Sequence, residues 1–126
     1  MPSDLSRHTP SPERQRNHAR GHTAEYIAAA WLMAKGYRIL VRRLSTPLGE
    51  VDIVAVRGRR VVFAEVKARR TFADCEAAIT PTLSTRVRRA ALLWLGRNPR
   101  YQAHEQGYDL VFIVPRRLPR HIPNGL

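Results

Sequence analysis

The chain has 126 residues, of which 44% are hydrophobic, and this size and composition predict one domain with a modest core. Its 22 Lys and Arg side chains against 10 Asp and Glu give a formal charge of +12, so the expected partner is a polyanion, with nucleic acid the first candidate. A single cysteine, Cys75, excludes an internal disulfide and a zinc site built from cysteines. The longest apolar run, Ile27 to Ala34, is too short for a membrane span, and the polar N-terminus lacks a signal core, so we expect a soluble cytoplasmic protein.

The first part of the chain predicts an arm, a helix and a strand. Residues 1–20 contain almost no large apolar side chains and are expected to form a flexible basic arm. Apolar residues then recur at helical spacing, with Thr23 as the N-cap and Gly36 as the C-terminal stop. Residues 37–44 indicate a strand, and the segment 45–49, which contains Pro and Gly, indicates a turn.

The middle of the chain predicts a β-hairpin. Two apolar strands, 50–57 and 60–68, are joined across Gly58 and Arg59. A two-residue loop with Gly in the first position favours a type II′ turn.

The last part of the chain predicts a second helix and a final strand. After a loop at 70–79, Thr80 caps a helix whose first residue is Pro81. Residues 108–114 are nearly all apolar, which is typical of a central strand, and the tail from Pro115 is expected to fray. The order of helix, three strands, helix and strand predicts a small α/β fold.

Four charged residues of the predicted hairpin fall on one face. With a two-residue loop, Asp52 lies opposite Glu65, and Glu50 lies opposite Lys67. Because side chains alternate along a strand, all four point the same way, beside strands that are otherwise apolar. Two facing carboxylates there repel each other unless they are paired or bind a cation.

This pattern has two interpretations that the spacing alone does not separate. Paired carboxylates with an open side suit Mg²⁺ or Mn²⁺, and such a site, assisted by the ammonium of Lys67, would hydrolyse a phosphodiester. Alternatively, Glu50 and Lys67 form a salt bridge, and Asp52 and Glu65 lie at a wet sheet edge. Glu25 is a further candidate acid; the helix dipole favours a carboxylate in a first turn, but a helix packed on the sheet would also direct it at the hairpin.

Several short motifs, in this order and spacing, resemble the YraN-type family of bacterial proteins. They are Gly-His-Thr-Ala-Glu at 21–25, Gly-Tyr-Arg-Ile-Leu at 36–40, Gly-Glu-Val-Asp-Ile-Val-Ala at 49–55 and Val-Phe-Ala-Glu-Val-Lys-Ala-Arg at 62–69. The resemblance continues through 88–91 and 108–111, so that it covers 21–114 and leaves the arm and the tail 115–126 outside. That family is similar to the restriction-endonuclease-like superfamily, which includes archaeal Holliday-junction resolvases.

The resemblance implies a mixed β-sheet flanked by helices and a Mg²⁺-dependent phosphodiesterase site. It assigns Glu25, Asp52 and Glu65 to the metal and Lys67 to the attacking water, with Glu50 as a supporting acid. Many relatives carry a Lys near the start of the second helix. This chain has none there, so Arg86 would take its place or the contact would be missing.

Arginines around these elements indicate a basic surface for DNA. Contacts of this kind go mainly to phosphates and weaken with salt, although scattered arginines on a solvated face are also ordinary. The candidates are Arg42, Arg43, Arg69, Arg70, Arg86 and Arg89.

The leading hypothesis is therefore a metal-dependent endonuclease acting on DNA, including branched intermediates of recombination or repair. The alternative is a nucleic-acid-binding protein that keeps a nuclease-like fold with little or no catalysis, and a scaffold that docks to another DNA-processing factor is a third. RNA as a further partner and a homodimer, which the junction resolvases form, are left open.

Overall fold

The computed structural model describes residues 12–126, with side chains placed from His22 onward. The elements, in chain order, are helix α2 (Pro12–Ala34), strands β1 (Arg38–Thr46), β2 (Gly49–Arg57) and β3 (Arg60–Ala68), helices α3 (Phe72–Ala77) and α4 (Pro81–Arg97), a 3₁₀ turn (Pro99–Tyr101), and strands β4 (Glu105–Ile113) and β5 (Arg120–Ile122). No helix within this range is long and apolar enough to cross a membrane.

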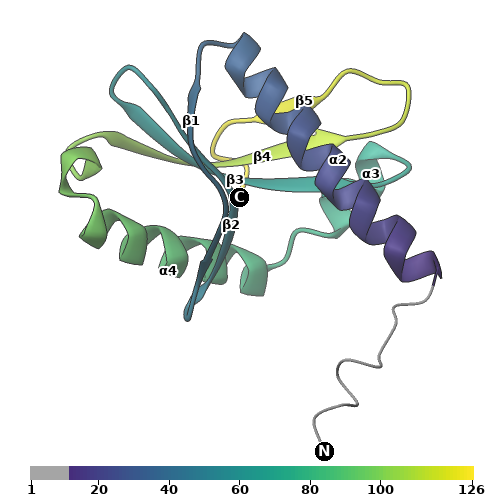
Figure 1. Cartoon of the computed structure of the whole chain (residues 1–126), viewed down its shortest axis with the longest axis horizontal. Helices are drawn as coiled ribbons and strands as arrows, with labels where there is room; N and C mark the ends of the chain where they lie inside the picture. Colours follow the sequence, from purple (N-terminus) through teal and green to yellow (C-terminus); the bar gives the residue numbers. More distant parts are fainter. Residues whose placement is uncertain (1–11) are drawn as a thin grey trace, which may run out of the picture.

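The strands form one mixed sheet in the order β1-β2-β3-β4-β5. Only β3 and β4 are parallel, because α3 and α4 form the crossover between them. Helix α2 packs on one face of the sheet, with Leu32 against Ile53 and Ala64, and α4 packs on the other, with Trp94 against Phe63 (Figure 1). The predicted α/β fold, a mixed sheet flanked by helices, is confirmed.

The hairpin turn forms as predicted. Gly58 has a φ of +58° and Arg59 does not have a positive φ, which fits the type II′ turn and its need for glycine. The register runs from Arg57 opposite Arg60 up to Ile53 opposite Ala64. Beyond that pair the β2–β3 ladder ends, although each strand continues, and the open end of the hairpin is where the acidic residues lie.

The first helix begins earlier than the sequence predicted. Helix α2 starts at Pro12, so Thr23 lies inside it rather than at its N-cap. Residues 13–20 are rich in good helix formers, and a proline is well tolerated in the first turn. Of the arm predicted for 1–20, residues 1–11 lie outside the described residues, and 12–20 belong to the helix.

The prediction that the C-terminal tail frays is wrong. Strand β5 pairs antiparallel with β4, with Ile122 opposite Leu110. The amide of Leu126 donates to the carbonyl of Tyr108 at 3.1 Å, and the Leu126 side chain packs against the core. The short strand was missed because the prolines around it disguise the pattern.

The predicted loop at 70–79 contains the short helix α3. The hydroxyl of Thr71 accepts from the Asp74 amide at 3.0 Å and caps this helix, and Cys75 is buried beneath it. Thr80 caps α4 in the same way, through the Leu83 amide at 3.1 Å, as the sequence predicted. These two caps fix where α4 begins relative to the end of β3.

Candidate active site and nucleic-acid interface

A pocket of about 340 Å³ lies between the open end of the hairpin and the start of α4. It is lined by the four charged hairpin residues together with Arg86 and neighbours on α4; the full set is Glu50, Asp52, Glu65, Lys67, Thr80, Thr82, Leu83 and Arg86. The structure therefore brings together the residues that the hairpin pattern placed on one face. We refer to this site as the acidic pocket.

Asp52 stands where β2 leaves β3. Its Oδ2 atom accepts a hydrogen bond from the backbone amide of Val66 at 2.8 Å. This side-chain bond replaces the backbone bond that a longer β2–β3 ladder would make there. The turn that follows β1 lies close to α4: a Cβ built on Gly49 would lie only 2.4 Å from the Arg86 carbonyl oxygen. Only glycine fits there, and this contact keeps the β2 end of the pocket against the helix.

The carboxyl groups of Asp52, which is partly buried, and of Glu65, which is buried, have raised pKa values. Burial, followed by the charge of Glu65, raises the pKa of Asp52 from 3.8 to about 7, and the charge of Glu25 adds to the effect. The Val66 amide and Lys67 oppose this rise. Burial also raises the pKa of Glu65, which is 7% exposed, although Lys67 and hydrogen bonding favour its ionised form. The pocket thus concentrates negative charge that the protein itself neutralises only in part.

Lys67 pairs with Glu65 rather than with Glu50. Its Nζ atom lies 3.2 Å from Glu65 Oε2, while Glu50 is exposed. The alternative interpretation, with a Glu50–Lys67 salt bridge and Glu65 at a wet edge, is therefore wrong. The reason is the end of the β2–β3 ladder at Ile53, which removes the cross-strand neighbour and leaves Lys67 closest to the acid two positions before it.

Glu25 does not line the acidic pocket and forms an ion pair with Arg43. Its Oε1 atom accepts from Arg43 Nε at 2.7 Å, and Arg43 holds a positive φ of 57° on β1. Its charge is still near enough to raise the pKa of Asp52 and Glu65. Within the described part of the chain, no three Asp, Glu, His or Cys side chains converge as a metal-binding group.

The predicted DNA-binding arginines lie in three separate places. On the α2 side of β1, Arg42 stacks over Tyr26 at 4.4 Å and Arg43 pairs with Glu25. On α4, Arg86 lines the acidic pocket and Arg89 is exposed. The remaining two, Arg69 and Arg70, follow β3.

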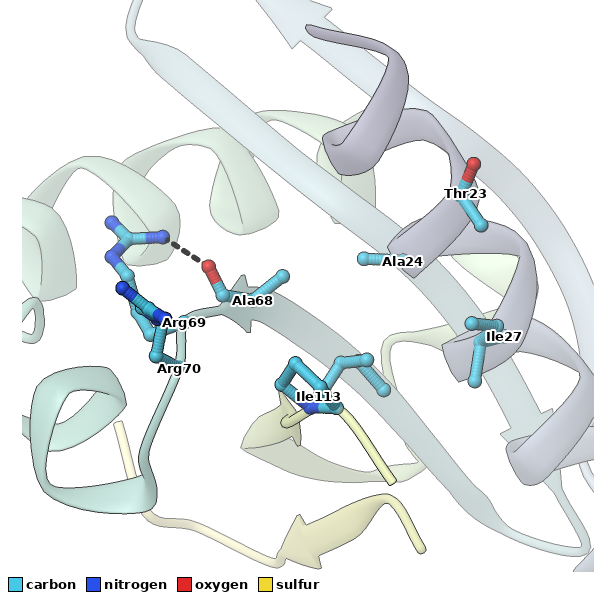
Figure 2. A pocket seen from close by; sticks show the side chains of 8 residues that line it. Thr23, Ala24, Ile27, Ala68, Arg69, Arg70 and Ile113 are labelled. Atoms are coloured by element: carbon cyan, nitrogen blue, oxygen red, sulfur yellow. Dashed lines mark hydrogen bonds between the residues drawn. The ribbon is translucent and has the colours of Figure 1, made fainter. Parts of the chain in front are cut away.

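Figure 2 shows the second pocket that these two arginines border. It has a volume of about 540 Å³ and is lined by Thr23, Ala24, Ile27, Ala68, Arg69, Arg70, Ile113 and Pro115, with Arg69 donating to the Ala68 carbonyl at 2.8 Å. Ala68 follows Lys67 directly, and successive side chains of a strand point to opposite faces. This pocket therefore lies on the opposite face of the sheet from the acidic pocket, and no Asp or Glu is among its lining residues.

A buried cluster around Asp109 was missed by the sequence reasoning. Arg60 binds Asp109 with two hydrogen bonds of 2.9 and 3.0 Å, His121 Nε2 lies 2.7 Å from Oδ2, and the Asn124 amide donates at 3.0 Å. The signal was an aspartate inside an otherwise apolar strand. Because its partners come from β3 and β5, the cluster ties the C-terminal segment to the sheet.

Comparison with known proteins identifies the family. The model of the "Uncharacterised protein family UPF0102" matches residues 24–113, which is most of the chain. The chain belongs to this family. A UPF0102 protein of Rhodopseudomonas palustris (strain HaA2) is 48% identical over 118 residues, covering 94% of this chain and 92% of the relative. Other UPF0102 relatives are those of Chelativorans sp. (strain BNC1), 48% identical over 88% of this chain and 90% of the relative, and Mesorhizobium japonicum, 46% identical over 92% and 93%.

The UPF0102 match confirms the resemblance to the YraN-type family. The match runs from Ala24 to Ile113, close to the limits that the motifs indicated. It contains all the residues of the acidic pocket and excludes β5, including His121.

Proposed function

We propose that this protein is a metal-dependent endonuclease that hydrolyses phosphodiester bonds in DNA, including branched intermediates of recombination or repair. The observation that carries the proposal is the acidic pocket, where the buried carboxyl group of Glu65 and the partly buried one of Asp52, both with raised pKa values, lie beside a lysine and an arginine. A carboxylate pair with an adjacent ammonium is a combination suited to phosphoryl chemistry.

The donor set fits a hard divalent cation. Asp52 and Glu65 supply carboxylate oxygens, the ligands that Mg²⁺ and Mn²⁺ prefer, and their mutual repulsion is what a cation would relieve. Glu25 would become a third ligand by exchanging Arg43 for the cation. When bound, Mg²⁺ or Mn²⁺ would polarise the phosphate and lower the pKa of a water molecule.

The cationic side chains of the pocket have separate roles in this proposal. Lys67 is held 3.2 Å from Glu65, so its ammonium is oriented to donate to the attacking water or to the charge that develops on the phosphate. Arg86 lines the same pocket from α4 and takes the role of the lysine that many relatives carry nearby. Its guanidinium can hold a phosphate through two parallel hydrogen bonds.

The charge of the whole chain supports DNA as the partner. A formal charge of +12 attracts a polyanion, and the contacts are expected to be salt-dependent. Because bacterial DNA lies in the cytoplasm, we expect the proposed activity there. That RNA is an additional substrate and that the protein forms a homodimer are predictions that further experiments would test.

The second candidate function is nucleic-acid binding without turnover. The observation that favours it is the Glu25–Arg43 ion pair, which occupies one of the three acids expected to hold the metal and leaves Asp52 and Glu65. On this hypothesis the arginines would bind DNA, and substitution of Asp52 would leave function intact.

A cleavage panel distinguishes the two functions. Labelled single strand, duplex, flap and four-way junction are incubated with Mg²⁺, Mn²⁺ or EDTA and with wild type, Asp52→Asn, Lys67→Ala, or the exposed-acid control Asp74→Asn. We expect metal-dependent cleavage that falls roughly 100-fold or more in the two pocket variants and is unchanged in the control. Cleavage that survives both pocket variants would overturn the assignment, and salt-sensitive binding without cleavage would establish the second function.

A further inference from the structure

A third pocket lies at the closed end of the hairpin, away from the acidic residues. It has a volume of about 410 Å³ and is lined by three arginines, one histidine and four neighbours: Arg38, Arg57, Arg100, His104, Gly36, Val56, Gly58 and Tyr101. The residues come from the turn after α2, from β1, from the hairpin turn and from the 3₁₀ turn after α4. No carboxylate is among its lining residues, and we call it the basic pocket.

Two of its guanidinium groups are held in position by aromatic rings. Arg57 lies over the Tyr37 ring at 4.6 Å and donates to the Lys35 carbonyl at 3.0 Å. Arg100 lies over the Tyr101 ring at 5.1 Å. A side chain that is already oriented loses less conformational freedom when it binds a ligand.

The positive charge of this pocket has no counterpart in the protein. Among residues 22–126, no Asp or Glu forms an ion pair with Arg38, Arg57 or Arg100. Glu105 follows His104 in the chain, but it pairs with Arg60 at 3.9 Å. The Nδ1 atom of His104 is buried without a hydrogen-bond partner, the one such side-chain atom among the described residues. Buried polar atoms of this kind commonly hydrogen-bond to a polar ligand or to water.

We propose that the basic pocket binds a phosphate group. Three guanidinium groups supply the planar forks that match phosphate oxygens. Access is open, because a Cβ on Gly58 would meet no atom within 4 Å, and its φ of +58° belongs to the exposed turn. A phosphate fits this set better than a carboxylate, since it can accept from several guanidinium groups at once.

The position of the pocket favours a phosphate of the DNA backbone over a free one. Residues at the open end of the β2–β3 hairpin and at the start of α4 line the acidic pocket, whereas residues of the hairpin turn and of the segment after α4 line the basic pocket. Figure 1 shows the course of the hairpin and of α4. The stretch of β2 from Asp52 to Arg57 spans about 17 Å, or about five nucleotides at roughly 3.4 Å each. Two exposed arginines of α4, Arg89 and Arg97, follow Arg86 of the acidic pocket along the helix. This step rests on the proposed nuclease function, whereas the phosphate site itself does not.

Binding in EDTA tests the pocket without cleavage. Fluorescence anisotropy over a salt series is measured with a labelled duplex of about 16 base pairs, which is long enough to reach both pockets. The test variant is Arg38→Gln/Arg100→Gln, because neither side chain donates a hydrogen bond to another of the residues 22–126. The control of equal charge is Arg116→Gln/Arg117→Gln in the exposed turn after β4. Thermal unfolding confirms that each variant is folded.

The expected result is specific to the test variant. The slope of log Kd against log salt concentration should fall by about one to two in the test variant, since each phosphate contact contributes about 0.9. The control variant should show no comparable difference from wild type. An equal loss in the control would overturn a specific site.

A titration with inorganic phosphate distinguishes the source of the phosphate. Shifts in the NMR signals of the Arg57 guanidinium and the His104 amide, lost in the test variant while the DNA slope is unchanged, would assign the pocket to a free phosphate group. Absence of both effects would overturn the proposal. Because no cleavage is measured, failure here leaves the nuclease function intact, and an inactive nuclease leaves this result intact.

Discussion

Asp52 on β2 and Asp109 on β4 are both withdrawn from solvent, but their surroundings differ in charge. Burial alone would raise the pKa of Asp109, yet hydrogen bonds from His121 and Arg60 lower it to about 2. Burial raises the pKa of Asp52 to about 7, and the acid Glu65 adds to the rise. One aspartate is surrounded by donors and the other by further carboxylates.

This difference separates an aspartate that holds the fold from one that is available to a ligand. The ionised form of Asp109 is stabilised by groups that the fold already provides, and so it needs nothing from outside. Asp52 is stabilised mainly as the neutral acid, and a bound cation would reverse that preference. Burial of an acid is therefore uninformative until its charged neighbours are known.

The largest expected effect is on the structural aspartate. Asp109→Ala should reduce the free energy of unfolding by about 3–5 kcal/mol, because it removes the buried carboxylate that pairs with the partly buried Arg60 guanidinium at 2.9 Å. Urea denaturation followed by circular dichroism measures the change. The control Glu76→Ala removes an exposed acid and should change stability by less than about 0.5 kcal/mol. An equal loss in both variants would contradict the assigned role of Asp109.

The second effect is stabilisation by metal. Mg²⁺ or Mn²⁺ at about 100 times its Kd should raise the free energy of unfolding by roughly 2.7 kcal/mol, because only the folded state brings Asp52 and Glu65 together. Asp52→Asn should abolish this gain. Differential scanning fluorimetry against metal concentration measures it. A gain that persists in Asp52→Asn would place the cation elsewhere.

The hairpin and its acids were predictable because the rules that govern them are local. Strand alternation and a two-residue turn place Glu50, Asp52, Glu65 and Lys67 from sequence distances alone. The end of the ladder at Ile53 was not visible, because it depends on the approach of the Gly49 turn to α4. That single feature changed the partner of Lys67.

Contacts between distant segments could not be read from the sequence. Arg60 and Asp109 are 49 residues apart, and nothing local connects them. Strand β5 has three residues and depends on pairing with β4, so its own pattern is too short to predict it. Arg43 was assigned to DNA, yet it pairs with Glu25 across the interface of α2 and β1. In each case the sequence supplied the residue type, and the tertiary structure supplied the partner.

The third effect is the dependence of stability on pH in EDTA. The folded-state pKa of Asp52 lies above its ordinary 3.8, so its contribution is fully present below about pH 4 and is lost as pH rises through about 7. The folded-state pKa of Asp109 lies below 3.8, so its contribution is present above about pH 4 and is lost as pH falls toward 2. Asp52→Asn should therefore stabilise the metal-free protein by roughly 1–3 kcal/mol at pH 8 and by little at pH 4. Urea midpoints from pH 2 to 9 measure both limbs, and a destabilised Asp52→Asn at pH 8 would contradict the raised pKa.

The smallest expected effect concerns Glu25 and Arg43, and its sign is more informative than its size. The ion pair is partly exposed, so breaking it should cost less than about 1 kcal/mol. Glu25→Gln removes a negative charge near Asp52, which should lower the pKa of Asp52 and move the alkaline loss of stability to lower pH with less amplitude. Arg43→Gln removes the positive partner and should do the opposite, while freeing Glu25 to bind a cation and so tightening Mn²⁺ binding measured by calorimetry. If both variants move the pH profile and the metal affinity in the same direction, Glu25 serves only to join α2 to β1, and the cation site consists of Asp52 and Glu65 without it.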